Sequence, residues 1–281
     1  MKTLHTAWIA VIVIFGLHGR ARANILDIFF LAGQSNASGR VTTGYAPDPR
    51  DTLVQYYYRT DGPPPNDVTS GGTFTTLQPL GSGYYGPEIS AGRSLVDLGL
   101  DPVIIKISDG STTLALDWNS TVPGVWWDHW RTDVQDALGD LVAAGNSVRL
   151  QGFFWLQGES DDTASEANAY QSNFLNFTND VTLHLSGLGY DTSKFGFITA
   201  LIQDRGGFNS IVRSAQQTVM DSMANGSWFD TNDLSVFDGV HFDPASVATI
   251  GERFVTTYSL LLLPEPSTVT LFVWSAMMVG M

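Results

Sequence analysis

The chain has 281 residues, of which 43% are hydrophobic and 15% are charged, a balance typical of a packed globular protein. Its formal net charge of −14 makes nucleic acid and anionic membrane surfaces poor partners, so a neutral substrate suits it better. The absence of cysteine excludes disulfides, a thiolate nucleophile and cysteine-ligated metal sites. No linker or change of composition divides the middle of the chain, so we expect one domain there.

The N-terminus is typical of a signal peptide. Lys2 supplies the positive charge, residues 7–17 form the apolar stretch, and residues 21–23 match an Ala-x-Ala cleavage site. The apolar stretch is too short for a comfortable membrane span. We therefore expect residues 1–23 to be removed on export and the mature domain not to span a membrane.

Apolar, strand-like segments then alternate with helical ones. Strands are predicted at 25–31, 103–107, 148–155, 195–202 and 228–229, and helices at 87–98, 126–144, 164–185, 210–224 and 246–262. Residues 41–82, rich in Pro and Gly, are predicted to be irregular, with a short strand at 53–58. Such alternation implies a parallel sheet covered by helices on both faces.

The C-terminus carries a second processing pattern. Pro-Glu-Pro-Ser at residues 264–267 is followed by an apolar run to the last residue. This end resembles the PEP-CTERM sorting signal of exported bacterial proteins, although the Arg-rich cluster that normally closes the signal is missing. The resemblance implies that sorting machinery processes residues 264–281, and it places the protein in the bacterial cell envelope or outside the cell. A frayed apolar terminus is the alternative.

The tetrad Gly33-Gln34-Ser35-Asn36 directly follows the first predicted strand. A serine in such a turn lies at the carboxyl edge of the sheet, where α/β enzymes hold nucleophiles. Taken alone, the tetrad also fits an ordinary turn between a strand and a helix. The interpretation therefore depends on whether the rest of the chain supplies a base, an acid and oxyanion donors.

A serine nucleophile needs a base, which is usually a histidine oriented by an acid. Outside the signal peptide, His129 and His184 fall in predicted helices, where we expect them to be partly exposed. His241 instead lies in a loop before the last helix, with Asp238 three residues upstream. The loop can bring the carboxylate to one imidazole nitrogen and leave the other for Ser35. A hydrogen-bonded loop with a chance Asp and His is the alternative.

An oxyanion needs preorganised hydrogen-bond donors. The N–H of Ser35, near a helix N-terminus, is one candidate. The N–H of Gly86 points to the same edge because Gly86-Pro87-Glu88 opens a helix. The side-chain amide of Gln157, after the end of a strand, is a third. Each signal is weak alone, since Gly-Pro-Glu is a common helix start and a glutamine often caps backbone.

These segments together resemble the sialate O-acetylesterase domain family, a group of SGNH-type hydrolases that overlaps with acetyl xylan esterases. The segments are Gly33-Gln34-Ser35-Asn36, Gly86-Pro87-Glu88, Gln157-Gly158-Glu159-Ser160-Asp161 and Asp238-x-x-His241. The resemblance implies a three-layer α/β/α, flavodoxin-like fold with a central parallel sheet over residues 24–263. It also implies Ser35 as nucleophile, His241 as base and Asp238 as orienting acid, with Ser35, Gly86 and Gln157 around the oxyanion.

Five further residues are expected to support this site: Gln34, Asn36, Glu88, Lys106 and Glu159. We hypothesise that Glu159 pairs with Lys106, and additive effects in a double-mutant cycle on stability would contradict that pairing. The segment from Lys106 to Thr112 resembles a Lys-x-x-x-Gly-Gly-Thr segment of the family, with Ser111 where the second glycine is usual. This departure affects the loop near the substrate.

The α/β-hydrolase fold is the rival, because its triad also runs Ser, acid, His. Residues 33–37 lack the second glycine of its nucleophile elbow, the serine follows the first strand, and the acid and base share one loop. These features favour the SGNH-type fold.

The resemblance implies removal of O-acetyl groups from carbohydrate through an acetyl-enzyme intermediate, with no metal or other cofactor. Four tryptophans are candidates for a sugar-stacking wall, although their spacing favours a place in the core: Trp118, Trp126, Trp127 and Trp130. A catalytically inactive polysaccharide-binding envelope protein on the same fold is the alternative, and an envelope matrix protein is a third. The acetylated sugar is left open among sialic acid, xylan and a bacterial exopolysaccharide.

Overall fold

The computed structural model describes residues 24–61, 67–81, 83–122 and 124–262. The predicted signal peptide and sorting tail lie outside these residues, so both assignments stay predictions. Within the described ranges, no helix combines the length and apolar character that a bilayer crossing requires.

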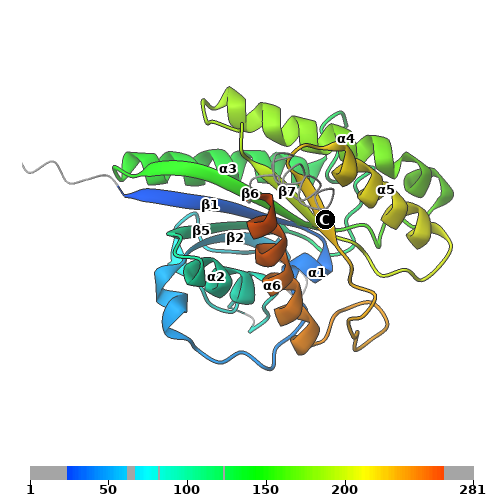
Figure 1. The fold of residues 1–281 in the computed structure, drawn as a ribbon, viewed down its shortest axis with the longest axis horizontal. Helices are drawn as coiled ribbons and strands as arrows, with labels where there is room; N and C mark the ends of the chain where they lie inside the picture. Colours follow the sequence, from blue (N-terminus) through cyan, green and yellow to red (C-terminus); the bar gives the residue numbers. More distant parts are fainter. Residues whose placement is uncertain (1–23, 62–66, 82, 123, 263–281) are drawn as a thin grey trace, which may run out of the picture.

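The centre of the molecule is a mostly parallel sheet (Figure 1). Its strands are β1 (Ile25–Gly33), β2 (Gln55–Asp61), β3 (Asp67–Thr69), β4 (Thr75–Thr76), β5 (Pro102–Ser108), β6 (Ser147–Leu156), β7 (Gly196–Ala200) and β8 (Gly226–Phe229). The spatial order is β3-β2-β5-β1-β6-β7-β8, with β4 also paired to β2. The run β5-β1-β6-β7-β8 is the flavodoxin-like order, so the predicted fold class is confirmed.

Helices cover both faces of this sheet, giving three layers. They are α1 (Ser35–Ser38), α2 (Glu88–Asp97), α3 (Val125–Ala143), α4 (Ala164–Gly187), α5 (Phe208–Ser222) and α6 (Pro244–Leu261), with a 3-10 turn at Pro49–Leu53. One core lies between the sheet and α3, α4 and α5, and the other lies between the sheet and α1, α2 and α6 (Figure 1).

Apart from Asp27, the first strand is apolar, and its two-sided burial explains why. Side chains of a strand point alternately to opposite faces. Ile28 and Phe30 accordingly enter the core under α3, α4 and α5, while Phe29 and Leu31 enter the other core. A strand buried on both faces cannot alternate apolar with polar residues, so from Ile28 onward β1 is a continuous apolar run that ends at the Gly-Gln-Ser-Asn turn.

The stretch 41–82 is more ordered than its composition predicts. The short strand expected at 53–58 begins two residues later, and as β2 it joins the main sheet in parallel with β5. Its tyrosines alternate between the two cores, with Tyr56 and Tyr58 on one face and Tyr57 on the other. Packing on both faces therefore makes this segment a sheet strand despite the Pro- and Gly-rich sequence beside it.

The tryptophans belong to the interior, as their spacing predicts. Trp118 and Trp130 are completely buried, and Trp126 and Trp127 are at most 8% exposed. All four lie in the core under α3, α4 and α5. The four rings are core residues rather than an exposed stacking wall, although Trp127 also borders a cavity.

Candidate active site

Ser35 lies at the carboxyl end of β1, the central strand. The next strands of the chain up to β5 lie on one side of β1, and β6 to β8 lie on the other, so the strand order reverses at this point. β1 ends at Gly33 and α1 begins at Ser35, which is 6% exposed. The N–H of Gln34 donates to the carbonyl of Leu156 at the end of β6, at 3.0 Å. In open parallel sheets, ligands bind at this position.

Ser35, His241 and Asp238 form a connected chain of hydrogen bonds. Ser35 Oγ lies 3.0 Å from His241 Nε2, and His241 Nδ1 lies 2.6 Å from Asp238 Oδ2. The structure thus brings Ser35 to a loop that carries both other residues, with His241 206 positions away along the chain. The predicted nucleophile, base and orienting acid therefore lie within hydrogen-bond reach of one another, as acyl transfer by a serine requires.

The carboxylate of Asp238 is held in its ionised form. Its Oδ1 accepts the backbone N–H groups of Val240 and His241 at 3.0 and 2.7 Å. Burial raises the pKa of Asp238, but hydrogen bonds from the His241 ring and these two amides outweigh burial and hold the pKa at about 2. An ionised carboxylate only accepts, so Nδ1 of His241 carries its proton and Nε2 is free to accept one.

The loop that carries the acid and base is braced internally. Val236 and Phe242 form an antiparallel bridge, and the N–H of Phe237 donates to the carbonyl of His241 at 2.9 Å. The N–H of Phe242 also donates to Asn36 Oδ1, at 3.2 Å. These bonds fix the imidazole relative to the serine before any substrate arrives.

The two amide side chains of the tetrad tie neighbouring loops to the nucleophile. Gln34 Oε1 accepts the N–H groups of Gly158 and Ser160 at 3.1 and 3.3 Å. Asn36 Nδ2 donates to Glu159 Oε1 at 2.7 Å. Burial raises the pKa of Glu159, and the hydrogen bond from Asn36 opposes that rise. Gln34, Asn36 and Glu159 therefore support the site by connecting three separate segments.

Two predicted oxyanion donors have other acceptors in the structure. The N–H of Gly86 donates to Glu88 Oε1 at 2.9 Å. The Gln157 amide donates to the carbonyl of Thr112 at 3.0 Å and to Asp161 Oδ2 at 2.7 Å, which uses both of its N–H groups. Neither Gly86 nor Gln157 thus presents a free donor, contrary to the prediction from sequence.

The role of Ser35 as an oxyanion donor stays a prediction. Its N–H lies in the first turn of α1, where backbone amides have no acceptor within the helix. Asp161, to which the sequence analysis gave no role, accounts for the orientation of Gln157, because its carboxylate accepts from that amide. Its position a few residues after the end of β6 is a sequence signal that could have identified it.

The predicted pairing of Lys106 with Glu159 is wrong. Lys106 Nζ lies 2.7 Å from Glu88 Oε2, and both side chains are completely buried. Lys106 follows the alternation of β5, so it points to the face covered by α2, and Glu88 is the first residue of α2. The ammonium also donates to the carbonyl of Ser38 at 2.7 Å, which links β5 and α2 to the end of α1.

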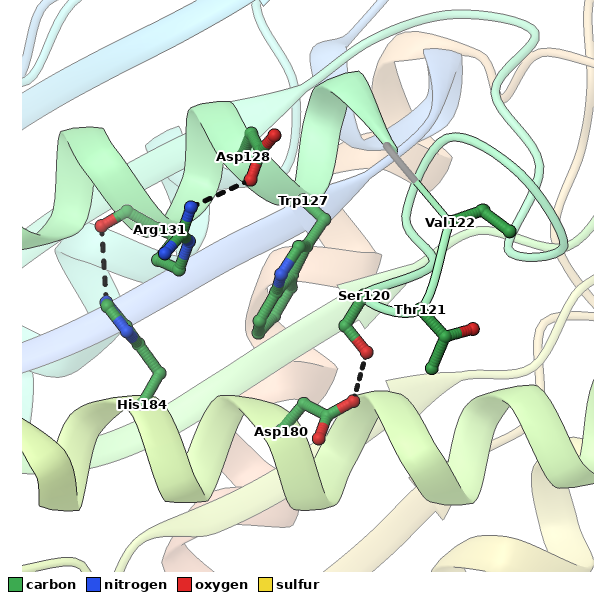
Figure 2. A pocket seen from close by; sticks show the side chains of 8 residues that line it. All are labelled: Ser120, Thr121, Val122, Trp127, Asp128, Arg131, Asp180 and His184. Carbon is green, nitrogen blue, oxygen red and sulfur yellow. Dashed lines mark hydrogen bonds and ion pairs between the residues drawn. The ribbon is translucent and has the colours of Figure 1, made fainter.

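A separate cavity of about 730 Å³ opens between α3 and α4 (Figure 2). Its polar groups are paired with one another: Arg131 with Asp128 at 2.9 Å, Ser120 with Asp180, and His184 with the carbonyl of Arg131 at 3.2 Å. His184 is thus a partly buried helix residue, in agreement with its predicted position. The cavity shares no lining residue with the triad, and its histidine has no serine partner there.

The fold is the flavodoxin-like α/β/α arrangement that the resemblance implied, with Ser35 directly after its first strand. The family model described as carbohydrate esterase, sialic acid-specific acetylesterase matches residues 85–259, more than half of the chain. The chain belongs to this family. The matched range contains Gln157, Asp238 and His241, and the geometry joins Ser35, which precedes it, to the same site.

Solved structures share the fold at low sequence identity. A protein from Arabidopsis thaliana is 16% identical with a TM-score of 0.64, covering 83% of this chain and 97% of that one. NanS is 14% identical with a TM-score of 0.60, covering 85% and 98%. A carbohydrate acetylesterase from Xanthomonas citri is 14% identical with a TM-score of 0.59, and the match covers 82% of this chain but only 55% of that protein. No curated protein sequence is significantly similar.

Proposed function

We propose that the protein is a serine esterase that removes O-acetyl groups from carbohydrate through an acetyl-enzyme intermediate. The observation that carries the proposal is the chain of hydrogen bonds from Ser35 through His241 to Asp238. Membership of a carbohydrate esterase family supports the substrate class. The similarity to a carbohydrate acetylesterase structure adds support for the fold on which the site is built.

The first half of the reaction forms the acetyl-enzyme. Ser35 Oγ attacks the acetyl carbonyl carbon while His241 Nε2 accepts the hydroxyl proton. The carbonyl oxygen becomes an oxyanion, which the N–H of Ser35 stabilises by a hydrogen bond. The bond to the sugar oxygen then breaks, and His241 Nε2 returns its proton to that oxygen, so the sugar leaves as an alcohol. Asp238 stabilises the imidazolium formed between these steps.

The second half repeats these steps with water. His241 takes a proton from the water, the hydroxide oxygen attacks the acetyl carbon, and the bond to Ser35 Oγ breaks. The proton on His241 returns to Ser35, and acetic acid is released, which loses its remaining proton to solvent. Every proton transfer in this sequence uses Nε2, the nitrogen that lies 3.0 Å from the serine oxygen.

Replacing the nucleophile tests the proposal. Ser35→Ala should lower kcat for acetylated sugars by about 10³-fold or more, while the protein keeps its thermal unfolding transition. Ser172→Ala, at an exposed serine of α4, is the matched control and should keep full activity.

A fluorophosphonate probe separates the esterase from an inactive polysaccharide-binding protein. The wild type should be labelled covalently at Ser35, and Ser35→Ala should not be labelled. Turnover retained by Ser35→Ala, or a wild type that neither reacts with the probe nor releases acetate, would contradict the proposal.

A further inference from the structure

Phe237 places an exposed aromatic ring against the imidazole of His241. The two ring centroids are 6.0 Å apart with an interplanar angle of 29°, a stacked arrangement. Phe237 is 56% exposed, whereas the tryptophans considered from the sequence are buried. A single exposed apolar residue is common on protein surfaces, so exposure alone indicates little. The position beside the catalytic base is what distinguishes this ring.

The backbone holds Phe237 where it is. Its N–H donates to the carbonyl of His241 at 2.9 Å, and the neighbouring pair Val236 and Phe242 closes the loop by an antiparallel bridge. Phe242 is 2% exposed and packs in the core beside α6, so it anchors the loop to the protein interior. Phe237 and His241 therefore lie together at the exposed end of a braced loop, and the ring is preorganised for contact from solvent.

The contact leaves the reactive edges of the imidazole open. His241 uses Nδ1 toward Asp238 and Nε2 toward Ser35, both in the plane of the ring. Phe237 instead lies against the face of that ring. The ring therefore lies beside Nε2 and does not take the place of a group that bonds to this nitrogen.

The group that must approach Nε2 is the oxygen of the leaving sugar, because His241 returns the proton to it. A pyranose attached to that oxygen extends over several ångströms and presents an apolar face of C–H groups. Aromatic rings bind apolar faces with little conformational entropy to lose.

We propose that Phe237 is the platform on which the C–H face of the leaving sugar packs. It is thus a specificity-determining residue that favours acetylated carbohydrate over small alkyl acetates. This inference rests on the proposed function.

Two substrates that share the acetyl group and differ in the leaving alcohol test it: fully acetylated glucose and ethyl acetate. Phe237→Ala should raise KM for acetylated glucose by about fivefold to tenfold, with little change in kcat, and leave hydrolysis of ethyl acetate unchanged. Phe237→Trp should restore the low KM. Leu183→Ala, which removes a side chain that is 66% exposed on α4, is the matched control and should change neither substrate.

The outcomes separate this inference from the proposed function. Equal losses on both substrates, together with a shifted pH profile of kcat, would make Phe237 a positioning residue for the imidazole and overturn the platform. Unchanged kinetics in Phe237→Ala would overturn it as well, as would a wild type that hydrolyses ethyl acetate but not acetylated glucose. A wild type that hydrolyses neither ester and does not react with fluorophosphonate contradicts the proposed function itself.

Discussion

Gly33 is the residue whose backbone makes the nucleophile turn possible. Its φ is +145°, which side-chain-bearing residues rarely adopt. A Cβ atom built at this position would lie 2.0 Å from the carbonyl oxygen of Leu156. The same carbonyl accepts the N–H of Gln34, so the close approach of β1 and β6 is what fixes the residue before Ser35.

Gly33→Ala should therefore both destabilise the protein and displace the nucleophile. We expect a loss of about 3 kcal/mol or more in the free energy of unfolding, because the backbone of two adjacent strands must separate. We also expect kcat to fall, because the serine moves with the turn. Chemical denaturation and steady-state kinetics measure the two effects.

Gly139→Ala is the matched control for this substitution. Gly139 lies in the interior of α3, where an added Cβ would meet nothing within 4 Å. Alanine there should stabilise the protein by about 0.5–1 kcal/mol, since glycine is the poorer helix former. Similar stabilities for the two variants would show that the close approach at β6 does not restrict position 33.

At the scale of elements, the buried pair of Lys106 and Glu88 joins β5 to α2. Glu88 uses one carboxylate oxygen for the ammonium and the other for the N–H of Gly86, so the start of α2 is tied to the strand. A buried ion pair stabilises a protein little more than apolar residues of the same size would. Removing one partner, however, leaves the other charge buried without a counter-ion and without water.

Lys106→Met should therefore cost about 3–5 kcal/mol of unfolding free energy, because it leaves the Glu88 carboxylate buried without its cation. Arg131→Met breaks the pair with Asp128, whose side chains are 49% and 57% exposed, and should change stability by at most about 1 kcal/mol. Urea denaturation of both variants measures the difference. Equal costs would mean that the Glu88 carboxylate reaches water once Lys106 is gone.

The elements themselves could largely be predicted, because their signals are local. The predicted start of α4 at residue 164 matches the structure, since Thr163 and Glu166 form a capping box there. β2 was predicted only as a short strand in an irregular stretch, because its partner β5 is distant in sequence and its flanks are rich in Pro and Gly.

The site shows the same division between local and distant signals. Asp238 and His241 share one loop, so their contact follows from a short-range pattern. The partners of Lys106, Gly86 and Gln157 depend on the direction in which each group points in the folded sheet, which spacing along the chain does not encode. The platform at Phe237 belongs to the second kind, because only the folded loop sets its ring against the imidazole.

For the molecule as a whole, the carboxyl edge of the sheet contains buried polar groups that link stability to pH. Asp161 is 1% exposed and accepts the N–H of Leu114 at 3.0 Å and the Gln157 amide at 2.7 Å. Burial raises its pKa to about 6 even though these hydrogen bonds oppose the rise. The folded pKa thus lies above the unfolded value of about 3.9.

The sign of the effect follows from this order. The folded protein binds the Asp161 proton more tightly than the unfolded chain, so the contribution of this group is fully present below about pH 4. It is lost as the pH rises through about 6, when the buried carboxyl must ionise. This one group should therefore lower the free energy of unfolding by up to about 3 kcal/mol between pH 4 and pH 7.

Asp161→Asn removes the titrating group and keeps the size of the side chain. The difference in the free energy of unfolding, variant minus wild type, should increase by roughly 2–3 kcal/mol from pH 4 to pH 7. Urea denaturation at both pH values measures this shift, with Asp128→Asn on the exposed face of α3 as the control. A difference that is constant with pH, or that moves toward the wild type, would mean that the Gln157 and backbone hydrogen bonds to Asp161 outweigh its burial.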